Sequence, residues 1–495
     1  MSAIIPSPNS DQVDLDNFLR RVRPPNWNNP KPQTLYDLIV VGGGPAGLAA
    51  AEFARRQDRS VALIERHHLG GNSLNSGSIP SKAIIRAARV LASMRDDEDY
   101  GAMAFSRPLT DFAAVMARMR RIRTRIAEYH AADRLCALGV DVFFCAARFE
   151  EPNALRAGDT QLSFKKAIIA TGARPRPSNI PGLEKIGYLT SESIFGLTQL
   201  PKRLGVIGGG PLGCELAQAF CRLGSWVTIV QNDPKFLPQE ERDAAELLSM
   251  SMSRDGVETR LNTTVVGARM ESGAKLLDTV NDDLKYSIAV DEVMLSIGRV
   301  PNVEDLGLEA AGIDFEATRG VEIDDFLRTT NADVYAAGDV CNSHQFTNVA
   351  ETSARLAVQN AFGASMERQG QLTIPWCTYC DPEIAHIGMD MREARRRGIP
   401  VKCFTVMMQD VDRAITDGRD DGFVKLYVKE GTDKILGATI VGTRASELIN
   451  EMSIIMSVGV GMRQLATILH TYPTQSDAIR LAAMAYVNNQ PASPC

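Results

Sequence analysis

The sequence predicts an α/β fold with two Rossmann-like domains, followed by a C-terminal domain of α+β type. The first observation is a unit of strand, glycine-rich turn and helix that occurs twice, beginning at Gly42 and Gly208, 166 positions apart (208 minus 42). Such a repeat indicates two copies of one supersecondary structure. The second observation is a change beyond about Gln371 to alternating strands and two long helical patterns, which is typical of an α+β domain.

The first copy opens with a short apolar strand over residues 38–41. This strand runs directly into the turn Gly42-Gly43-Gly44-Pro45-Ala46-Gly47. An alanine-rich helix over residues 48–56 follows, and a second strand over residues 61–64 ends in Glu65. Residues 1–34 are polar and rich in proline, so we expect an arm that lies on the surface, with ordered structure beginning at Tyr36.

The second copy has the same order of elements. A strand over residues 204–207 leads into the turn Gly208-Gly209-Gly210-Pro211-Leu212-Gly213. A helix over residues 214–223 and a strand over residues 226–230 follow, and this strand ends in Gln231-Asn232-Asp233.

The residues of these turns have the chemistry that a dinucleotide requires. The first glycine makes the tight turn, the second lets the backbone approach a pyrophosphate, and the third allows the helix to pack closely on the strand. The helix N-terminus supplies NH groups and the positive end of a dipole. Glu65, 18 residues after Gly47, stands where an acid accepts hydrogen bonds from ribose hydroxyls. The alternative at each turn is an ordinary structural role.

The second copy departs from this pattern at the end of its second strand. A carboxylate at position 231 would favour NADH and an arginine would favour NADPH, but Gln231 is neutral and decides neither. Asp233, two residues further along the chain, slightly favours NADH. The sequence therefore leaves the choice between NADH and NADPH open.

The composition restricts the classes of protein to which this chain can belong. The chain has 495 residues, 44% of them hydrophobic and 23% charged, with a net charge of −6, which is typical of a globular protein and suggests no nucleic-acid or membrane partner. No apolar run reaches the roughly 18 residues of a membrane-spanning helix. The N-terminus lacks a basic region of a secretory signal, and nine cysteines follow no disulfide framework, so we expect a cytoplasmic location.

Several further segments carry a resemblance to a known family. They are Ala170-Thr171-Gly172-Ala173-Arg174-Pro175, Ser296-Ile297-Gly298-Arg299-Val300-Pro301-Asn302 and Tyr335-Ala336-Ala337-Gly338-Asp339. With the two turns, they resemble the pyridine nucleotide-disulfide oxidoreductase family of glutathione reductase, dihydrolipoamide dehydrogenase and mercuric reductase. The segments at 23–27, 374–379 and 411–414 are similar to mercuric-reductase-like members. The resemblance covers roughly residues 23–488.

The resemblance implies a domain organisation and a set of partners. Residues 1–34 would form the N-terminal arm, 35–184 and 297–369 an FAD-binding domain, 185–296 an NAD(P)-binding domain, and 370–495 a dimerisation domain. The protein would be a homodimer that uses FAD and NAD(P)H and reduces a small-molecule acceptor.

The resemblance also implies roles for individual residues. Lys82 matches a lysine that hydrogen-bonds near flavin N5, and Glu215 matches its ion-pair partner, with two unrelated surface charges as the alternative. Pro211 stands where some relatives place a tyrosine gate, and a helix over about residues 349–361 would point its N-terminus at the flavin. The residues expected to bind the two dinucleotides are Gly42, Gly44, Pro45, Ala46, Gly47, Glu65, Gly71, Asn72, Ser73, Lys82, Ala170, Thr171, Gly172, Gly338, Asp339, Gly208, Gly210, Pro211, Leu212, Gly213, Gln231, Asn232 and Gly298.

The chain leaves the family pattern at its redox centre. The segment of residues 70–82 has the spacing GGxCxxxxCxPSK of a redox-active dithiol helix, but Ser73 and Ser78 stand at both sulfur positions. A serine hydroxyl is far less acidic than a thiol and cannot form a disulfide. We therefore expect that this pair stores no electrons.

A second departure lies near the C-terminus. The segment of residues 470–477 resembles the HPTxxE motif, with Tyr472 at the position of the catalytic histidine and Asp477 in place of the glutamate. Ser73, Ser78, Tyr472 and His470 are expected to line an acceptor site formed across two subunits. Cys495 is expected to be an unremarkable terminal residue, the CxxC of Cys377 and Cys380 to be packing, and His67 and His68 to lie in a solvated loop without a metal.

Three functions follow from these patterns. The leading hypothesis is an FAD-dependent NAD(P)H oxidoreductase in which electrons pass from the flavin directly to a quinone, a dye, dioxygen or a second nicotinamide. The first alternative is a cysteine-to-serine variant of a mercuric(II) or disulfide reductase. The second alternative is a non-catalytic FAD-binding redox sensor or scaffold.

Overall fold

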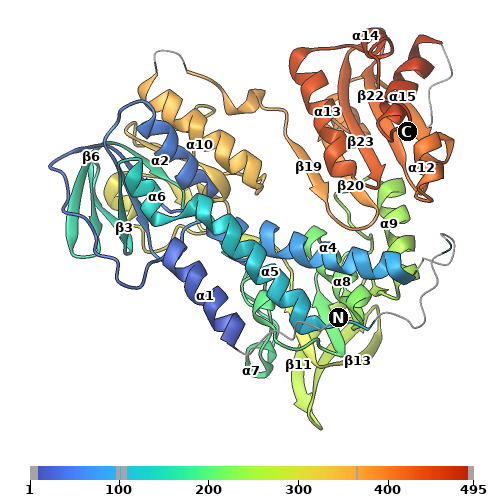
Figure 1. The fold of residues 1–495 in the computed structure, drawn as a ribbon, viewed down its shortest axis with the longest axis horizontal. Helices are drawn as coiled ribbons and strands as arrows, with labels where there is room; N and C mark the ends of the chain where they lie inside the picture. The colour runs from blue at the N-terminus through green and yellow to red at the C-terminus, as the bar shows by residue number, and fades with distance from the viewer. Residues whose placement is uncertain (1–8, 96–100, 102–108, 364–365, 489–495) are drawn as a thin grey trace. The chain divides into compact units, whose positions relative to one another are not determined.

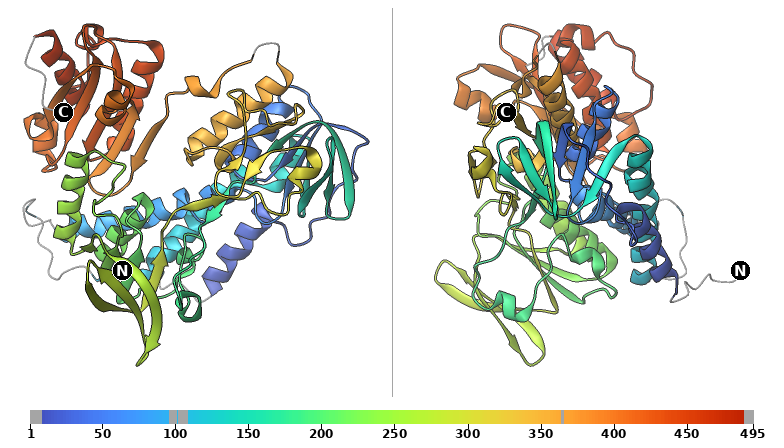
Figure 2. Two further views of the ribbon diagram at one scale, coloured as in Figure 1. Left: turned by 180° about the vertical axis from the view of Figure 1, so that it is seen from behind. Right: turned by 90° about the vertical axis from the view of Figure 1, so that its left-hand side faces the viewer.

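The computed structural model describes residues 9–95, 101, 109–363 and 366–488, which belong to two compact units (Figure 1, Figure 2). The first unit comprises Met1–Asn179, Gly187–Leu200 and Met294–Leu372, and the second comprises Ile180–Ile186, Pro201–Val293 and Thr373–Cys495. No described helix is long and apolar enough to cross a membrane. The expected division into three domains stays a prediction, and the second unit includes parts of all three.

The first unit is organised around a seven-stranded sheet of order β3-β2-β1-β6-β5-β4, with β18 paired to β6. Its parallel strands are β1 (Tyr36–Val41), β2 (Val61–Glu65), β3 (Val140–Phe144), β6 (Thr160–Ile169) and β18 (Val334–Ala336). Strands β4 (Ala147–Glu151) and β5 (Ala154–Ala157) add an antiparallel edge. The parallel strands are nearly continuous apolar runs because both faces of such a sheet are covered.

Two helices that are far apart in the sequence pack together on this sheet. Helix α2 (Pro45–Arg55) lies against α10 (Thr347–Phe362), as Figure 1 shows. Small residues such as Ala50, Ala54 and Ala357 are fully buried between them, which lets the helix backbones approach closely. The expected helix over residues 349–361 is confirmed as part of α10.

The N-terminal segment differs from the expectation of a surface arm. Residues Asn9–Val22 form helix α1, which packs against α5 (Phe112–Ile126). Phe18 and Val22, one helical turn apart, are 4% and 0% exposed and belong to the core of the first unit. This apolar pair on one helix face explains the difference, because a helix buries residues spaced by four on the same side.

Trp27 continues this docking beyond the helix. Its ring lies edge-on to Phe144 at 5.4 Å, and its Nε1 donates to the Val142 carbonyl at 3.1 Å. The remaining elements of the first unit are α3 (Gly71–Asn75), α4 (Ser78–Arg95), η2 (Ala127–His130), α6 (Ala132–Ala137), β7 (Ala173–Pro175), η3 (Ile194–Gly196), β15 (Arg299–Pro301), η4 (Leu308–Ala311), β16 (Phe315–Glu316), β17 (Gly320–Val321), η5 (Gly338–Val340) and η6 (Gln369–Gln371).

The second unit contains the other copy of the nucleotide-binding pattern. Its sheet has the order β10-β9-β8-β14, made of β8 (Arg203–Ile207), β9 (Trp226–Val230), β10 (Glu258–Arg260) and β14 (Glu292–Leu295). Helix α8 (Pro211–Leu223) follows β8, as the sequence predicts, and a further helix, α9 (Arg242–Asp255), follows β9. The nearby elements are α7 (Leu183–Ile186) and the three-stranded sheet β11 (Thr264–Glu271), β12 (Ala274–Asn281) and β13 (Leu284–Val290).

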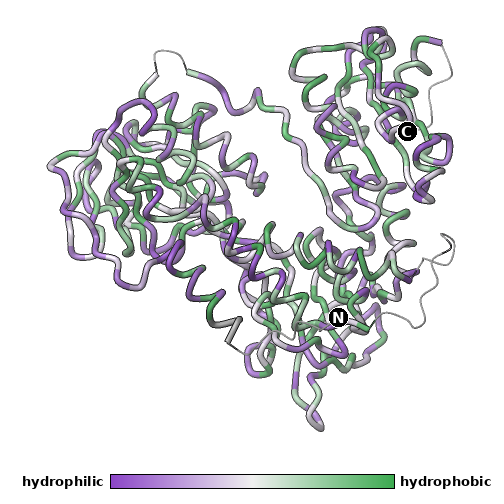
Figure 3. The backbone as a smooth tube through the Cα atoms, viewed as in Figure 1, coloured by the Kyte–Doolittle hydropathy of each residue, from purple (hydrophilic) through white to green (hydrophobic). Residues whose placement is uncertain are grey.

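The C-terminal part of this unit confirms the expected α+β pattern. Its five antiparallel strands have the order β19-β20-β23-β22-β21, and Figure 3 shows apolar stretches along them. The strands are β19 (Pro375–Thr378), β20 (Glu383–Gly388), β21 (Val401–Met407), β22 (Phe423–Lys429) and β23 (Ile435–Gly442). The helices are α11 (Met391–Arg397), η7 (Met408–Asp410), α12 (Asp412–Thr416), α13 (Ala445–Val458), α14 (Met462–Leu465) and α15 (Asp477–Val487).

A buried carboxyl group, that of Glu240, lies just before α9 in the second unit. Glu240 is 5% exposed, and its Oε1 accepts a hydrogen bond from the Thr378 hydroxyl at 3.0 Å. Burial raises the pKa of Glu240 from 4.5 to about 7, because the charged form loses its hydration. Between these two values the folded chain binds more protons than the unfolded chain. The free energy of unfolding therefore falls as the pH rises through this window.

We expect Glu240→Gln to stabilise the protein at pH 8 and to have little effect at pH 4.5, because glutamine keeps the acceptor oxygen without carrying a charge. The expected gain at pH 8 is at most about 3 kcal/mol in the free energy of unfolding. Denaturant unfolding at both pH values measures it. Glu246→Gln, an exposed change on α9, is the matched control. An equal loss of stability at both pH values would contradict the prediction.

Candidate functional site

The first glycine turn is a tight connection between β1 and α2. A Cβ at Gly42, whose φ is 109°, would lie 2.3 Å from the Ala170 carbonyl oxygen, and a Cβ at Gly47 would lie 1.7 Å from the Gly42 carbonyl oxygen. Neither position has room for any other residue. Helix α2 starts at Pro45 without a side-chain cap, so its first NH groups remain available to an anion.

Glu65 closes this turn from the end of β2. Its Oε2 accepts from the Gly43 NH at 2.7 Å, and its Oε1 accepts from the His67 NH at 2.6 Å. The sequence predicted a ribose acceptor at this position but did not predict these backbone contacts. Glu65 thus holds the turn in shape as well as placing a carboxylate beside it.

Ser73 and Ser78 lie on two consecutive helices, which corrects the expectation of one serine helix. Helix α3 carries Ser73 and ends at Asn75, and α4 begins at Ser78. Ser76 between them has φ −147° and ψ 18°, which no helix accommodates. Ser78 is exposed, whereas the half-buried Ser73 accepts a hydrogen bond from the Thr347 hydroxyl at 3.2 Å.

Thr347 is the first residue of α10, so the N-terminus of that helix lies at Ser73. Sequence reasoning missed Thr347, because the helical pattern becomes apolar only from Val349. Asn72 on α3 donates from Nδ2 to the Ala173 carbonyl at 2.5 Å. The structure therefore brings Asn72, Ser73 and α10 together within the first unit.

The return segments of the first unit, which are residues 170–175, 296–302 and 335–339, lie near the same turn. The Ala170 NH donates to the Val41 carbonyl at 2.8 Å, and the Thr171 hydroxyl donates to the Asn302 carbonyl at 2.7 Å. Asp339 accepts from Arg299 at 2.6 Å, an ion pair that sequence reasoning did not predict. Gly338 packs beside Ala46, since a Cβ there would lie 3.1 Å from the Ala46 Cβ.

The second glycine turn repeats the first in its hydrogen bonding. The Gly209 NH donates to the Gln231 Oε1 at 2.8 Å, just as the Gly43 NH donates to Glu65. Glu65 and Gln231 are 166 positions apart (231 minus 65), the same offset as the two turns. Gln231 therefore stands in the place of Glu65, with its carbonyl oxygen used by the turn and its NH₂ group free of that contact. Asn232 beside it is exposed.

Both turns fit a dinucleotide pyrophosphate. A Cβ at Gly210 would meet open space, and at Gly44 it would meet only the Gly71 Cα, at 3.6 Å. Helix α8 begins at Pro211 without a side-chain cap, as α2 does at Pro45. Bare backbone at a helix N-terminus is what a phosphate group needs. The remaining residues predicted for these sites, Leu212, Gly213, Gly172 and Gly298, lie in or next to the same turns and return segments.

Lys82 and Glu215 lie in different units. Lys82 is half-buried on α4 of the first unit. Glu215 is buried on α8 of the second unit, where its Oε1 accepts from the Tyr379 NH at 2.9 Å. The ion pair expected from the sequence stays a prediction.

The C-terminal residues Tyr472, Asp477 and His470 make three separate contacts. Tyr472 is 70% exposed and donates from its hydroxyl to Asp412 Oδ2 at 2.7 Å, while Asp477 pairs with Arg480. The hydrogen bond to Asp412 raises the pKa of the Tyr472 phenol. The ring of His470 instead contacts Glu451 at 2.7 Å, and its side chain is only 7% exposed. This burial does not favour His470 as a lining residue.

Asp412 is a candidate site residue that sequence reasoning missed. It lies 60 positions before Tyr472, and no sequence pattern pairs the two. Among the described residues, no three His, Cys, Asp or Glu side chains gather as metal ligands. Cys377 is half-buried and Cys380 is buried, and Cys495 lies outside the described residues.

Comparison with known proteins identifies the class. The family model "Pyridine nucleotide-disulphide oxidoreductase" matches residues 36–354, and that of its dimerisation domain matches residues 374–483. Mercuric reductase from Bacillus cereus is 29% identical over 451 residues, covering 91% of this chain and 71% of that protein. Dihydrolipoyl dehydrogenase from Thermus scotoductus is 32% identical over 459 residues, covering 91% of this chain and 97% of that protein.

Solved structures agree with the sequence comparison. The HOCl-induced flavoprotein disulfide reductase RclA from Escherichia coli superposes with a TM-score of 0.80 at 26% identity, covering 91% of this chain and 99% of that one. LpdA from Mycobacterium tuberculosis gives a TM-score of 0.82 at the same identity and coverage. The chain belongs to the pyridine nucleotide-disulphide oxidoreductase family. It is an enzyme of this flavoprotein class, with FAD and NAD(P)H as its cofactors and a C-terminal dimerisation domain.

We expect Gln231→Glu to lower kcat/KM for NADPH at least about tenfold relative to NADH, because a carboxylate at this position repels the 2′-phosphate. Gln231→Arg should shift the ratio the other way. Flavin reduction measured with each nucleotide tests both. Gln161→Glu, which adds the same charge at an exposed position of β6 in the first unit, is the control. An unchanged ratio in both Gln231 variants would show that this residue does not face the ribose.

Proposed function

We propose that this protein is an FAD-dependent NAD(P)H oxidoreductase that reduces a small-molecule acceptor directly, without a redox disulfide. The observation that supports this most is serine at both positions of the dithiol spacing, Ser73 and Ser78, within a chain that keeps both glycine turns. FAD supplies the redox chemistry, accepting hydride from the nicotinamide and releasing electrons to the acceptor. A quinone, a dye, dioxygen or a second nicotinamide fits this scheme.

Ser73 has a polar role in this proposal. Its hydroxyl accepts from Thr347, the first residue of α10, so the pair forms a neutral contact where a thiolate would carry charge. The free NH groups and dipole of the α10 N-terminus are then left to stabilise negative charge on the bound flavin. Lys82 is proposed to hydrogen-bond near flavin N5, with Glu215 as its ion-pair partner, as the family pattern implies.

Tyr472 and Asp412 are proposed to supply the acceptor with a proton. The Tyr472 hydroxyl donates to Asp412 Oδ2 at 2.7 Å, and this contact holds the phenol in one orientation. An exposed phenol that is fixed by a carboxylate is a suitable general acid for a reduced acceptor. Asp477 is proposed to act only through its Arg480 pair, at the start of α15.

A homodimer is proposed to complete this site. The C-terminal domain carries strongly exposed apolar side chains, namely Ile454, Val458 and Leu469. Such residues favour contact with a second copy of the chain, and Tyr472 lies in the same C-terminal region. Dimerisation would place Tyr472 of one subunit near the flavin of the other.

The alternative with specific support is a mercuric(II) or disulfide reductase whose cysteines have been replaced by serine. Its support is the similarity to mercuric reductases and to the disulfide reductase RclA. Tyr472 and Asp477 count against it, because the chain also lacks the histidine and glutamate that serve a thiol pair in the family pattern. No observation specifically supports the alternative of a non-catalytic redox sensor.

Anaerobic titration of the holoprotein with dithionite distinguishes these functions. We expect two reducing equivalents per subunit, since the flavin is the single redox centre. Ser73→Cys/Ser78→Cys should take up four and show thiolate-to-flavin absorption if a disulfide has been restored. Uptake of four equivalents by the wild-type protein, or no flavin reduction by NADH or NADPH, would rule out the proposed function.

We expect Tyr472→Phe to slow reoxidation of the reduced flavin by a quinone about tenfold or more, because the proton donor is lost. Reduction of the flavin by NAD(P)H should not change. Stopped-flow measurement of the two half-reactions separates these effects, and Tyr129→Phe, an exposed tyrosine of the first unit, serves as the control. Equal slowing of both half-reactions would contradict the assignment of Tyr472.

A further inference from the structure

The loop of residues 231–241 joins β9 to α9 and has two different halves. It begins at Gln231, which the Gly209 NH holds against the second glycine turn. The first half is open to solvent, with Asn232 and Lys235 exposed. The second half is buried, and Phe236, Leu237 and Glu240 are each at most 6% exposed. One end of this loop thus lies at the proposed ribose subsite and the other lies inside the second unit.

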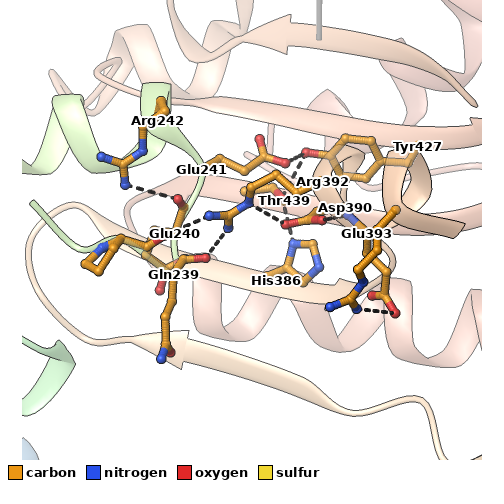
Figure 4. Close-up of polar contacts among 12 residues, drawn as sticks. Gln239, Glu240, Glu241, Arg242, His386, Asp390, Arg392, Glu393, Tyr427 and Thr439 are labelled. Carbon is orange, nitrogen blue, oxygen red and sulfur yellow. Dashed lines mark hydrogen bonds and ion pairs between the residues drawn. The ribbon is translucent and has the colours of Figure 1, made fainter. Parts of the chain in front are cut away.

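Two arginines bind the carbonyl groups of the loop from different elements. Arg242, the first residue of α9, donates to the carbonyls of Phe236 at 2.9 Å, Leu237 at 2.6 Å and Glu240 at 3.2 Å. Arg392 on α11 donates to the carbonyls of Pro238 at 2.7 Å and Gln239 (Figure 4). Residues 234–241 lie outside any strand, so these side chains supply the partners that buried backbone carbonyls need.

Glu241 ties the end of the loop to the C-terminal sheet. Its Oε2 accepts from Lys425 Nζ at 2.9 Å, and its Oε1 accepts from the Tyr427 hydroxyl (Figure 4). Both partners lie on β22, and their side chains are almost fully buried. Lys425 also contacts Asp243 at 2.5 Å. A buried ammonium group keeps its charge only with such carboxylate partners.

The contact continues across the sheet beyond Tyr427. The Tyr427 hydroxyl lies 3.2 Å from the Thr439 Oγ1 on β23, which in turn lies 2.8 Å from the His386 Nδ1 on β20. Glu241 is therefore bound to three neighbouring strands through one chain of hydrogen bonds. This makes the last residue of the loop its most firmly held point.

We infer that Glu241 is a positioning residue for the pyridine nucleotide, and that Lys425 and Tyr427 of the C-terminal sheet fix the 231–241 loop through it. The inference rests on the proposed placement of the nucleotide ribose at Gln231. A loop held at both ends keeps Gln231, Asn232 and Lys235 in one arrangement before the nucleotide binds, so less conformational entropy is lost on binding. The dimerisation domain thereby contributes to cofactor affinity without contacting the cofactor.

Glu241→Gln in the full-length holoprotein tests the inference. Glutamine has nearly the same shape but no negative charge for Lys425, so the hold of the C-terminal sheet on the loop is weakened without creating a cavity. We expect the Kd of NADPH or NADH and the KM in flavin reduction to rise about tenfold. The limiting rate of flavin reduction and the reoxidation of dithionite-reduced flavin should stay unchanged. Glu292→Gln, which breaks a lysine–carboxylate contact of 2.7 Å with Lys275, is the matched control.

Two further variants keep the test decisive if Glu241→Gln fails to fold. Lys425→Arg preserves the charge and should bind the nucleotide within about twofold of wild type, because arginine keeps both carboxylate contacts. Tyr427→Phe removes one hydrogen bond to Glu241 and should raise the Kd about threefold, without a change in reoxidation.

Three results would count against specific claims. Unchanged nucleotide affinity in Glu241→Gln and Tyr427→Phe would overturn the positioning role. Slowing of both half-reactions together with a lower melting temperature would also overturn it, since that pattern indicates a structural role alone. If wild-type flavin is not reduced by either nucleotide, the proposed function fails, whereas normal reduction with unaltered variant affinity removes only the present inference.

Discussion

The close approach of the Gly42 turn to the Ala170 carbonyl is the constraint on which the first unit depends. It brings the end of β1 against the end of β6, and β18 joins the same side of the sheet. Once these carboxyl ends meet, α2 must start at Pro45 and α10 must pack beside it. Ser73, Thr347 and Asp339 are then gathered around one edge, although they are far apart in the sequence. The chemistry proposed for the flavin follows from this single backbone contact.

The fold was largely predictable because its signals are local. Each glycine turn lies between an apolar strand and a helix, and the structure has both copies within a few residues of their expected bounds. Helix α1 was not predicted, since only a few residues, among them Phe18, Leu19 and Val22, mark an apolar face in a polar segment. Its burial depends on α5, which is about a hundred residues away, and no local pattern reports such a contact.

The site was less predictable than the fold for the same reason. Glu65 and Gln231 were found from their distance to a turn, but the pairs Asp412–Tyr472 and Arg299–Asp339 join residues 60 and 40 positions apart. Such pairs depend on tertiary packing and produce no periodic pattern in the sequence. The single serine helix was also wrong, because the dithiol spacing gives no hint of the break at Ser76. Patterns of residue type thus located the two glycine turns, while the contacts made around them required the fold.

The burial of helix α1 limits where the chain can be truncated. The family match begins at residue 36, so a truncation chosen from that boundary would discard α1 and Trp27. It would uncover the apolar surface that Phe18, Val22 and Trp27 now cover beside β3 and α5. A recombinant fragment made in this way would expose hydrophobic surface on the first unit and would tend to aggregate. The N-terminal helix is therefore part of the smallest folding unit.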